Sequence, residues 1–160
     1  MKIGCPKEIK PQEFRVGMTP ATAGEAVRHG HEVLIETGAG NGAGFSDADY
    51  EALGASIAPD AESVFAASDM IVKVKEPQAV ERARLREGQV LFTYLHLAPD
   101  PDQTRDLIAS GATCIAYETV TDDRGGLPLL APMSEVAGRL APQVGAWTLQ
   151  KANGGRGVLM

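Results

Sequence analysis

The chain has 160 residues, which is enough for one domain with a full hydrophobic core and too few for two. Its composition, 44% hydrophobic and 22% charged, is typical of a soluble globular protein. The net charge of −6 and the scattered basic residues argue against a nucleic-acid partner, and no apolar stretch is long enough to cross a membrane. The N-terminus, MKIGCPKEIK, lacks the apolar core of a signal peptide, so we expect a cytoplasmic protein.

The two cysteines, Cys5 and Cys114, each lie in a short apolar run typical of a strand. Disulfides are rare in the cytoplasm, so we expect two buried free thiols. Neither cysteine has a metal-ligating neighbour at a useful spacing, and we expect no metal site.

Strand-like and helix-like segments alternate through the first part of the chain. In order, the pattern predicts a strand at 2–5, a helix at 20–29, a strand at 32–37, a helix between Ser46 and Gly54, and a helix at 61–67. Thr19 and Asp60 are predicted helix caps, and Ser46 with Asp49 forms a capping-box pattern.

The middle of the chain predicts strands at 70–75, 90–96 and 113–117, with helices at 78–86 and between Asp100 and Gly111. Strands separated by short helices indicate βαβ units, whose right-handed connections make neighbouring strands parallel. We therefore predict an α/β fold, a mostly parallel open sheet with flanking helices of the Rossmann-like or flavodoxin-like kind.

The C-terminal part differs. Residues 134–151 predict one long helix capped by Ser134, and Pro142 inside it predicts a kink or a division into two helices. The last apolar residues, VLM, resemble the start of a strand that is cut short.

In an open parallel sheet, ligands bind beyond the carboxyl ends of the strands. Arg15 lies in the loop after the first strand, Lys75 ends the run MIVKVK, and His96 ends the run VLFTYLH. A guanidinium, an ammonium and an imidazole on one rim suit a small anion. Tyr117 and Glu118 follow the last strand at the same rim.

Each of these residues also has a structural interpretation. An arginine in an exposed loop is usually a solvated charge, and a histidine at a strand end is more often structural. Lys73 and Lys75 share one face of a strand, so we expect at least one of them to point into a cleft. His29 and His31 flank a turn glycine, and we expect both to face solvent.

Two glycine-rich stretches do not predict a nucleotide site. The loop GAGNGAG, residues 38–44, lacks the G-x-G-x-x-G spacing of the dinucleotide fingerprint and is interpreted as a tight turn. The stretch GGRG, residues 154–157, is too short and lies too late in the chain to form a phosphate loop with its helix.

Several segments resemble a known family. They are IGCPKEIKPQEFRVGMTP, GHEVLIETGAGNGAGFSDADY, VKVKEP, LFTYLHLA, IAYET and LPLLAPMSEVAGRLAPQVGA. Together they closely resemble the N-terminal domain of bacterial L-alanine dehydrogenases over nearly the whole chain. The related nicotinamide nucleotide transhydrogenases and saccharopine dehydrogenases share parts of the pattern, but the histidine in YLHLA favours alanine dehydrogenase.

The resemblance implies a reaction and a set of roles. The reaction is the reversible NAD-dependent oxidative deamination of L-alanine to pyruvate and ammonium. Arg15 and Lys75 would bind the substrate carboxylate and carbonyl, with Lys75 and His96 as catalytic residues and His96 as the acid/base. Tyr94 would line the substrate site, and Met133 and Ser134 would line the cleft beside the nicotinamide. The family forms hexamers, so a homo-oligomer is expected.

The resemblance also implies a domain organisation. Residues 1–132 would form the substrate-binding domain, and residues 133–160 would form a long interdomain helix and the start of a linker to an absent Rossmann NAD-binding domain. We therefore expect the chain alone to be inactive. Two alternatives stay open: a naturally truncated, non-catalytic protein that binds a small acid or pairs with another subunit, and a fragment of a transhydrogenase nucleotide-binding subunit.

Overall fold

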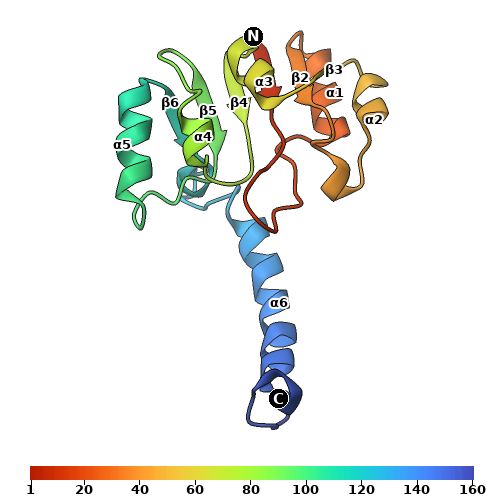
Figure 1. Ribbon diagram of the computed structural model, residues 1–160, viewed down its shortest axis with the longest axis vertical. Coiled ribbons are helices and arrows are strands. Elements are labelled where there is room, and N and C mark those ends of the chain that lie inside the picture. Colours follow the sequence, from red (N-terminus) through yellow and green to blue (C-terminus); the bar gives the residue numbers. More distant parts are fainter. The chain divides into compact units, whose positions relative to one another are not determined.

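Six parallel strands form one sheet in the computed structural model, which describes residues 1–160 (Figure 1). The strands are β1 (Lys2–Cys5), β2 (Glu32–Glu36), β3 (Ser56–Ala58), β4 (Met70–Val72), β5 (Val90–Thr93) and β6 (Thr113–Ala116). Their order across the sheet is β3-β2-β1-β4-β5-β6, and every neighbouring pair is parallel. The predicted α/β class is confirmed, and the order is that of a doubly wound dinucleotide-binding sheet.

Helices follow most of the strands, as predicted. They are α1 (Pro20–Arg28), α2 (Asp47–Glu51), α3 (Ala61–Ala67), α4 (Ala79–Arg82), α5 (Pro101–Ser110) and α6 (Ala131–Leu149), with short 3₁₀ turns at Asn41–Ala43, Tyr117–Thr119 and Lys151–Asn153. The predicted caps Thr19 and Asp60 are confirmed, because their side chains accept backbone N–H bonds at the starts of α1 and α3; Asp100 does the same at the start of α5. The capping box of Ser46 and Asp49 is also present.

The predicted bounds of three elements were wrong, and one strand was missed. The strands predicted at 70–75 and 90–96 end at Val72 and Thr93, and the helix predicted at 78–86 is reduced to Ala79–Arg82. The short edge strand β3 was missed because three residues between two helices give too little periodicity to recognise.

The early end of β4 has a specific cause. The side chain of Glu8 accepts the backbone N–H of Val74 at 2.6 Å, a bond that a neighbouring strand would otherwise take. Pairing between β1 and β4 therefore stops at Gly4 and Ile71. The chain beyond β4 keeps its contact with the neighbouring chain, because Lys73 N–H donates to the carbonyl of Phe92 at 3.1 Å.

The chain divides into two compact units, Met1–Tyr117 with the sheet and Glu118–Met160 with α6.

The predicted cap at Ser134 was wrong: α6 begins at Ala131, and Ser134 N–H donates to the carbonyl of Leu130 within its first turn. Pro142 does not divide α6 into two helices. Proline removes one hydrogen bond, to Gly138, and α6 has no buried residue, so water can satisfy that carbonyl. None of the helices is both long and apolar enough to cross a membrane.

Apolar cores lie on both faces of the sheet, as a parallel sheet requires. On one face, strand residues pack with Ala23 of α1 and Tyr50 of α2; on the other, strand residues pack with Phe65 of α3 and Leu107 of α5. Consecutive residues of β4, Ile71 and Val72, belong to opposite cores because side chains alternate along a strand. Figure 1 shows α1 and α2 near β2 and β3, and α4 and α5 near β5 and β6.

Both cysteines are free, as expected. Cys5 is fully buried, and burial raises the pKa of its thiol to about 12, whereas Cys114 is only half-buried. The expectation that both are buried therefore holds for Cys5 alone. We expected both His29 and His31 to face solvent. His29 is exposed, whereas His31 is half-buried.

Gly4 in the central strand β1 lets α3 approach the sheet closely. A Cβ atom at this position would lie 2.7 Å from Cγ1 of Val64 and would also overlap Ser68. We predict that Gly4→Ala lowers the free energy of unfolding by about 1–3 kcal/mol through overpacking, measured by urea denaturation followed by far-ultraviolet circular dichroism.

The matched control is Gly138→Ala, because a Cβ atom there meets nothing within 4 Å and the residue lies inside α6. Alanine is the better helix former, so this change should be neutral or stabilising. Equal losses for the two variants would contradict the packing explanation.

Candidate functional site

The strand order reverses between β1 and β4, and the chain leaves the carboxyl ends of these two strands in different directions. In open α/β sheets this point forms the ligand-binding crevice. The segment after β1 carries Glu8, Glu13 and Arg15, and the segment after β4 carries Lys73 and Lys75. The two cations predicted from the sequence therefore follow the two strands that border the crevice.

Arg15 is held by Glu13. Its Nε and Nη2 atoms donate to the two carboxylate oxygens of Glu13 at 2.8 and 2.6 Å, and its side chain is 49% exposed. The bidentate bond lowers the pKa of Glu13 and raises the pKa of Arg15. Since this bond uses one edge of the guanidinium, the other edge is left for a second carboxylate.

Arg15 also lines a pocket of about 290 Å³. The other lining residues come from the same loop and from the glycine-rich loop after β2: Lys7, Glu8, Glu13, Phe14, Gly38, Ala39, Asn41 and Gly42. Lys75, Tyr94 and His96 do not line this pocket. The pocket therefore accounts for Arg15 alone among the predicted site residues.

Lys75 lies in a small charged cluster at the same rim. Its Nζ is 3.6 Å from Oε2 of Glu76, and Glu76 also pairs with Lys10. Burial alone raises the pKa of Glu76, but the bond from Lys10, a backbone hydrogen bond and the charges of Lys75 and Lys10 together outweigh it, and the pKa lies below its usual value. The charge of Lys75 also contributes to the lowered pKa of Glu13, the partner of Arg15.

Aromatic side chains from the ends of β5 and β6 form the next part of the rim. The ring of Tyr94 stacks on the ring of His96 with centroids 6.2 Å apart, and Tyr117 meets Tyr94 edge-on at 5.0 Å. Phe92 packs edge-on against Tyr117 at 4.3 Å. The pKa of Arg15 is raised mainly by its bond with Glu13 and to a smaller extent by the electrostatic effect of Tyr94.

His96 has a backbone conformation that few non-glycine residues adopt. Its φ is +49°, in the left-handed region, and such residues cluster at functional sites. The adjacent carbonyl, that of Leu95, accepts a hydrogen bond from Nε2 of the buried Gln103 in α5. α5 therefore helps to hold the His96 loop in this conformation.

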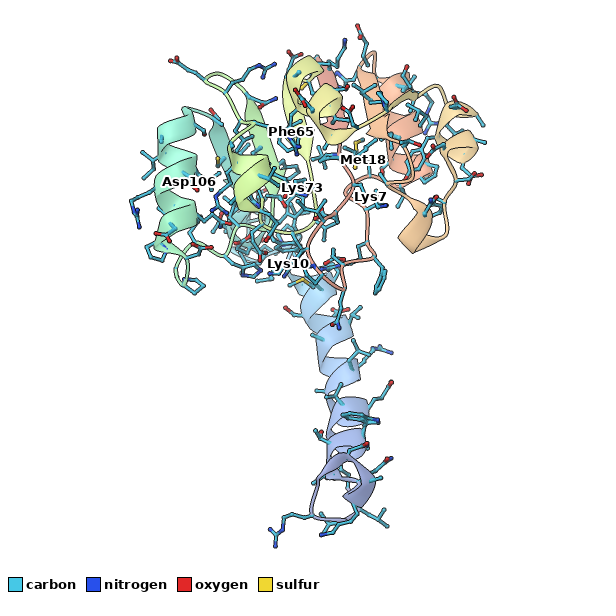
Figure 2. The ribbon with its side chains drawn as sticks, in the orientation of Figure 1. Lys7, Lys10, Met18, Phe65, Lys73 and Asp106 are labelled. Carbon is cyan, nitrogen blue, oxygen red and sulfur yellow. The ribbon has the colours of Figure 1, made fainter.

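Below the rim lies a buried ion cluster, which we call the Lys73 cluster and define as Lys73, Glu8 and Glu81. Lys73 Nζ lies 3.0 Å from Oε2 of Glu8 and 2.7 Å from Oε1 of Glu81, and the three side chains are at most 2% exposed. Burial alone lowers the pKa of Lys73, but the two carboxylates more than offset it and raise the pKa. These pKa effects show that the cluster keeps its lysine charged. Figure 2 labels Lys73 in the central part of the sheet unit, beside α4.

The structure thus gathers Arg15, Lys75, Tyr94 and His96 at the carboxyl ends of β1, β4 and β5, within one unit. We expected at least one of Lys73 and Lys75 to point into a cleft. Lys73 is buried in the ion cluster, and Lys75 reaches the rim. Met133 and Ser134 lie in the first turn of α6, in the second unit.

A dinucleotide does not fit this sheet in the usual way. In Rossmann domains a glycine-rich turn follows the first strand, and an acidic residue later in the chain binds the ribose. Here a long loop follows β1, and Glu36 at the end of β2 accepts the backbone N–H of Lys7 at 2.8 Å. No group of three or more His, Cys, Asp or Glu side chains is placed to hold a metal ion.

Sequence reasoning missed several residues that position the rim: Glu8, Glu81, Thr93 and Gln103. All four are polar, and all are buried. Glu81 could have been recognised as the N3 residue of a capping box, whereas the burial of Glu8 depends on contacts across the fold that local patterns do not reveal.

Comparison with known proteins identifies the family of the chain. Residues 4–137 match the family model described as "Alanine dehydrogenase/PNT, N-terminal domain". The chain belongs to this family. Alanine dehydrogenases of Halomonas elongata, Mycobacterium tuberculosis and Bacillus subtilis are 59%, 58% and 52% identical to it over 160 residues.

Solved structures agree with the sequence comparison. An L-alanine dehydrogenase superposes with a TM-score of 0.90 at 52% identity over 99% of this chain, and a transhydrogenase from Sinorhizobium meliloti with a TM-score of 0.72 at 27% identity over 78%. The chain spans 43% of the length of the Halomonas alanine dehydrogenase and 44% of the solved L-alanine dehydrogenase. The resemblance to the alanine dehydrogenase N-terminal domain is confirmed.

The Lys73 cluster gives a stability prediction. Lys73→Met would leave two buried carboxylates without a cation, so we predict a loss of about 3–5 kcal/mol in the free energy of unfolding, measured by urea denaturation at pH 7. The matched control is Lys2→Met, because Lys2 forms a partly exposed pair with Glu32 at 3.3 Å and should cost at most about 1 kcal/mol. Similar losses in both variants would show that the cluster is not a buried ion network.

Proposed function

We propose that the chain is the substrate-holding part of an NAD-dependent alanine dehydrogenase, and that it binds pyruvate and L-alanine. The observation that carries the proposal is the half-exposed Arg15 guanidinium, which Glu13 holds by one edge at 2.8 and 2.6 Å, with the Lys75 ammonium at the same carboxyl edge of the sheet. The free edge of a guanidinium can accept a substrate carboxylate, and a nearby ammonium adds a second positive charge.

Arg15 and Lys75 suit different parts of the substrate. A guanidinium binds a carboxylate in a planar, bidentate geometry and fixes its orientation, and Glu13 leaves one edge of Arg15 available for this. An ammonium is a compact positive charge that stabilises the negative charge developing on a carbonyl oxygen. We assign the carboxylate to Arg15 and the carbonyl to Lys75.

His96 is the proposed acid/base catalyst. Histidine side chains titrate near neutral pH, so one can accept a proton from an attacking water and return it later. The stacking of Tyr94 on one face of the His96 ring supports the assignment, because it fixes the plane of the imidazole at the rim. Tyr94 would also form a wall of the substrate site.

We infer that the nucleotide comes from a separate domain. NAD would supply the hydride chemistry, and this sheet does not fit it. In our proposal residues 1–132 bind the substrate, residues 133–160 lead towards the nucleotide-binding part, and Met133 and Ser134 contact the nicotinamide. A cytoplasmic location, a homo-oligomer and inactivity of the chain alone remain predictions.

Pyruvate binding to the 160-residue chain tests the proposal. In a titration followed by ¹H–¹⁵N nuclear magnetic resonance, pyruvate should shift the amide signals of Arg15, Lys75 and Tyr94. Arg15→Lys should weaken binding about tenfold or more, because a lysine cannot replace the bidentate geometry. Lys75→Met should weaken it by a similar factor through loss of one charge.

Lys2→Met is the control for charge, because Lys2 lies at the opposite, amino end of β1 and loses one positive charge equally. It should leave the pyruvate affinity unchanged. Equal effects of Lys2→Met and Lys75→Met, or no shifts at the rim of a folded sample, would refute the proposed substrate site.

A further inference from the structure

Glu8 has an unusual environment for a carboxylate. It lies in the loop after β1, its side chain is 2% exposed, and both of its oxygens accept hydrogen bonds. Oε1 accepts the backbone N–H of Val74 at 2.6 Å and that of Lys75 at 3.4 Å, while Oε2 accepts from Lys73 Nζ at 3.0 Å. All three donors belong to the segment that directly follows β4.

Burying a carboxylate is costly, and a buried ion pair is often no more stabilising than apolar side chains of the same volume. Stability alone therefore gives little reason for the Lys73 cluster as a whole to be charged. The bonds it forms have a clear geometric result, because they fix consecutive residues 73–75 against the loop that carries Arg15.

Lys75 is held from its other side as well. Thr93 Oγ1 donates to the carbonyl of Lys75 at 2.9 Å, and Thr93 is fully buried in β5. The amide and the carbonyl of Lys75 are thus each bonded to a side chain of a different element. This fixes the Cα atom from which its side chain reaches the rim.

We propose that Glu8 is a positioning residue for Lys75: its buried carboxylate sets where the Lys75 ammonium stands relative to Arg15. The inference rests on the proposed role of these two cations in substrate binding. Because Glu8 and Arg15 share one loop and Lys75 follows β4, any movement between loop and strand changes the spacing of the two charges. A displacement of about 1 Å in such a site has a large effect on binding and catalysis.

A double-mutant cycle between Glu8 and Lys75 tests the inference on the 160-residue chain, with pyruvate as the ligand. In Glu8→Gln, the amide nitrogen would face either the Lys73 ammonium or the Val74 and Lys75 N–H groups, donor against donor, so the side chain must give up part of its contact with residues 73–75. We expect Glu8→Gln to weaken pyruvate binding about fivefold in the wild-type background and to have almost no further effect in Lys75→Met, since coupled residues are not additive.

The matched control is Glu36→Gln. Glu36, the last residue of β2, also accepts a backbone N–H, that of Lys7, but it forms no hydrogen bond or ion pair with residues 73–75. It should leave both the pyruvate affinity and the hydrogen exchange of the Val74 and Lys75 amides unchanged, whereas Glu8→Gln should speed the exchange of both. If Glu8→Gln does not fold, Glu8→Asp keeps the charge but withdraws the oxygens, and the same cycle applies.

The outcomes separate the two hypotheses. Equal losses from Glu8→Gln in both backgrounds would overturn the positioning role while leaving Lys75 as a substrate ligand. If Lys75→Met leaves the pyruvate affinity unchanged, or wild type does not bind pyruvate, the proposed function fails instead. Amide exchange then decides the positioning role, and unchanged exchange at Val74 and Lys75 in Glu8→Gln would overturn it.

Discussion

One buried lysine with two carboxylates organises the carboxyl edge of this sheet. Lys73 pairs with Glu8 from the loop after β1 and with Glu81 from α4, so a single ammonium joins three elements. A buried ammonium without partners would be far too costly, and each carboxylate alone would be as well. The three groups therefore stabilise one another, and none can be removed without leaving an uncompensated charge. The positions of the β1 loop, of residues 73–75 and of α4 follow from this requirement.

The sheet has the strand order of a dinucleotide-binding sheet, but the groups that follow its central strands are different. Where a Rossmann domain has a tight glycine turn after β1, this chain has a long loop that carries Glu8, Glu13 and Arg15 to the crevice. Glu36 bonds to the backbone of that loop rather than remaining available for a ribose. Arg15 and Lys75, each paired with an acidic neighbour, follow the two strands at this edge of the sheet. The proposed binding of a small carboxylate rests on these two cations, and the chain belongs to the alanine dehydrogenase/PNT N-terminal domain family.

The sequence was a good guide to the elements and a poorer one to what holds the site together. Parallel strands, caps at Thr19 and Asp60, and the rim positions of Arg15, Lys75 and His96 all follow from local patterns and strand direction. The early end of β4 could not be predicted, because it depends on Glu8, far away in the sequence, taking the N–H of Val74. Nor could the left-handed backbone of His96 be predicted, since Gln103 of a later helix helps to impose it. Pairings between distant residues leave no local pattern to read.

The charge of Lys73 tests the account most directly. Titration of its side chain by ¹³C and ¹⁵N nuclear magnetic resonance would report its pKa in the folded protein. We predict a pKa above the ordinary value of 10.5, because the carboxylates of Glu81 and Glu8 outweigh the effect of burial. Since the unfolded lysine then loses its proton first, the stabilisation is complete below that ordinary pKa and is lost as the pH rises through the folded value. A Lys73 that is neutral at pH 8 would contradict the account, because the buried cluster would then lack the cation on which the rim depends.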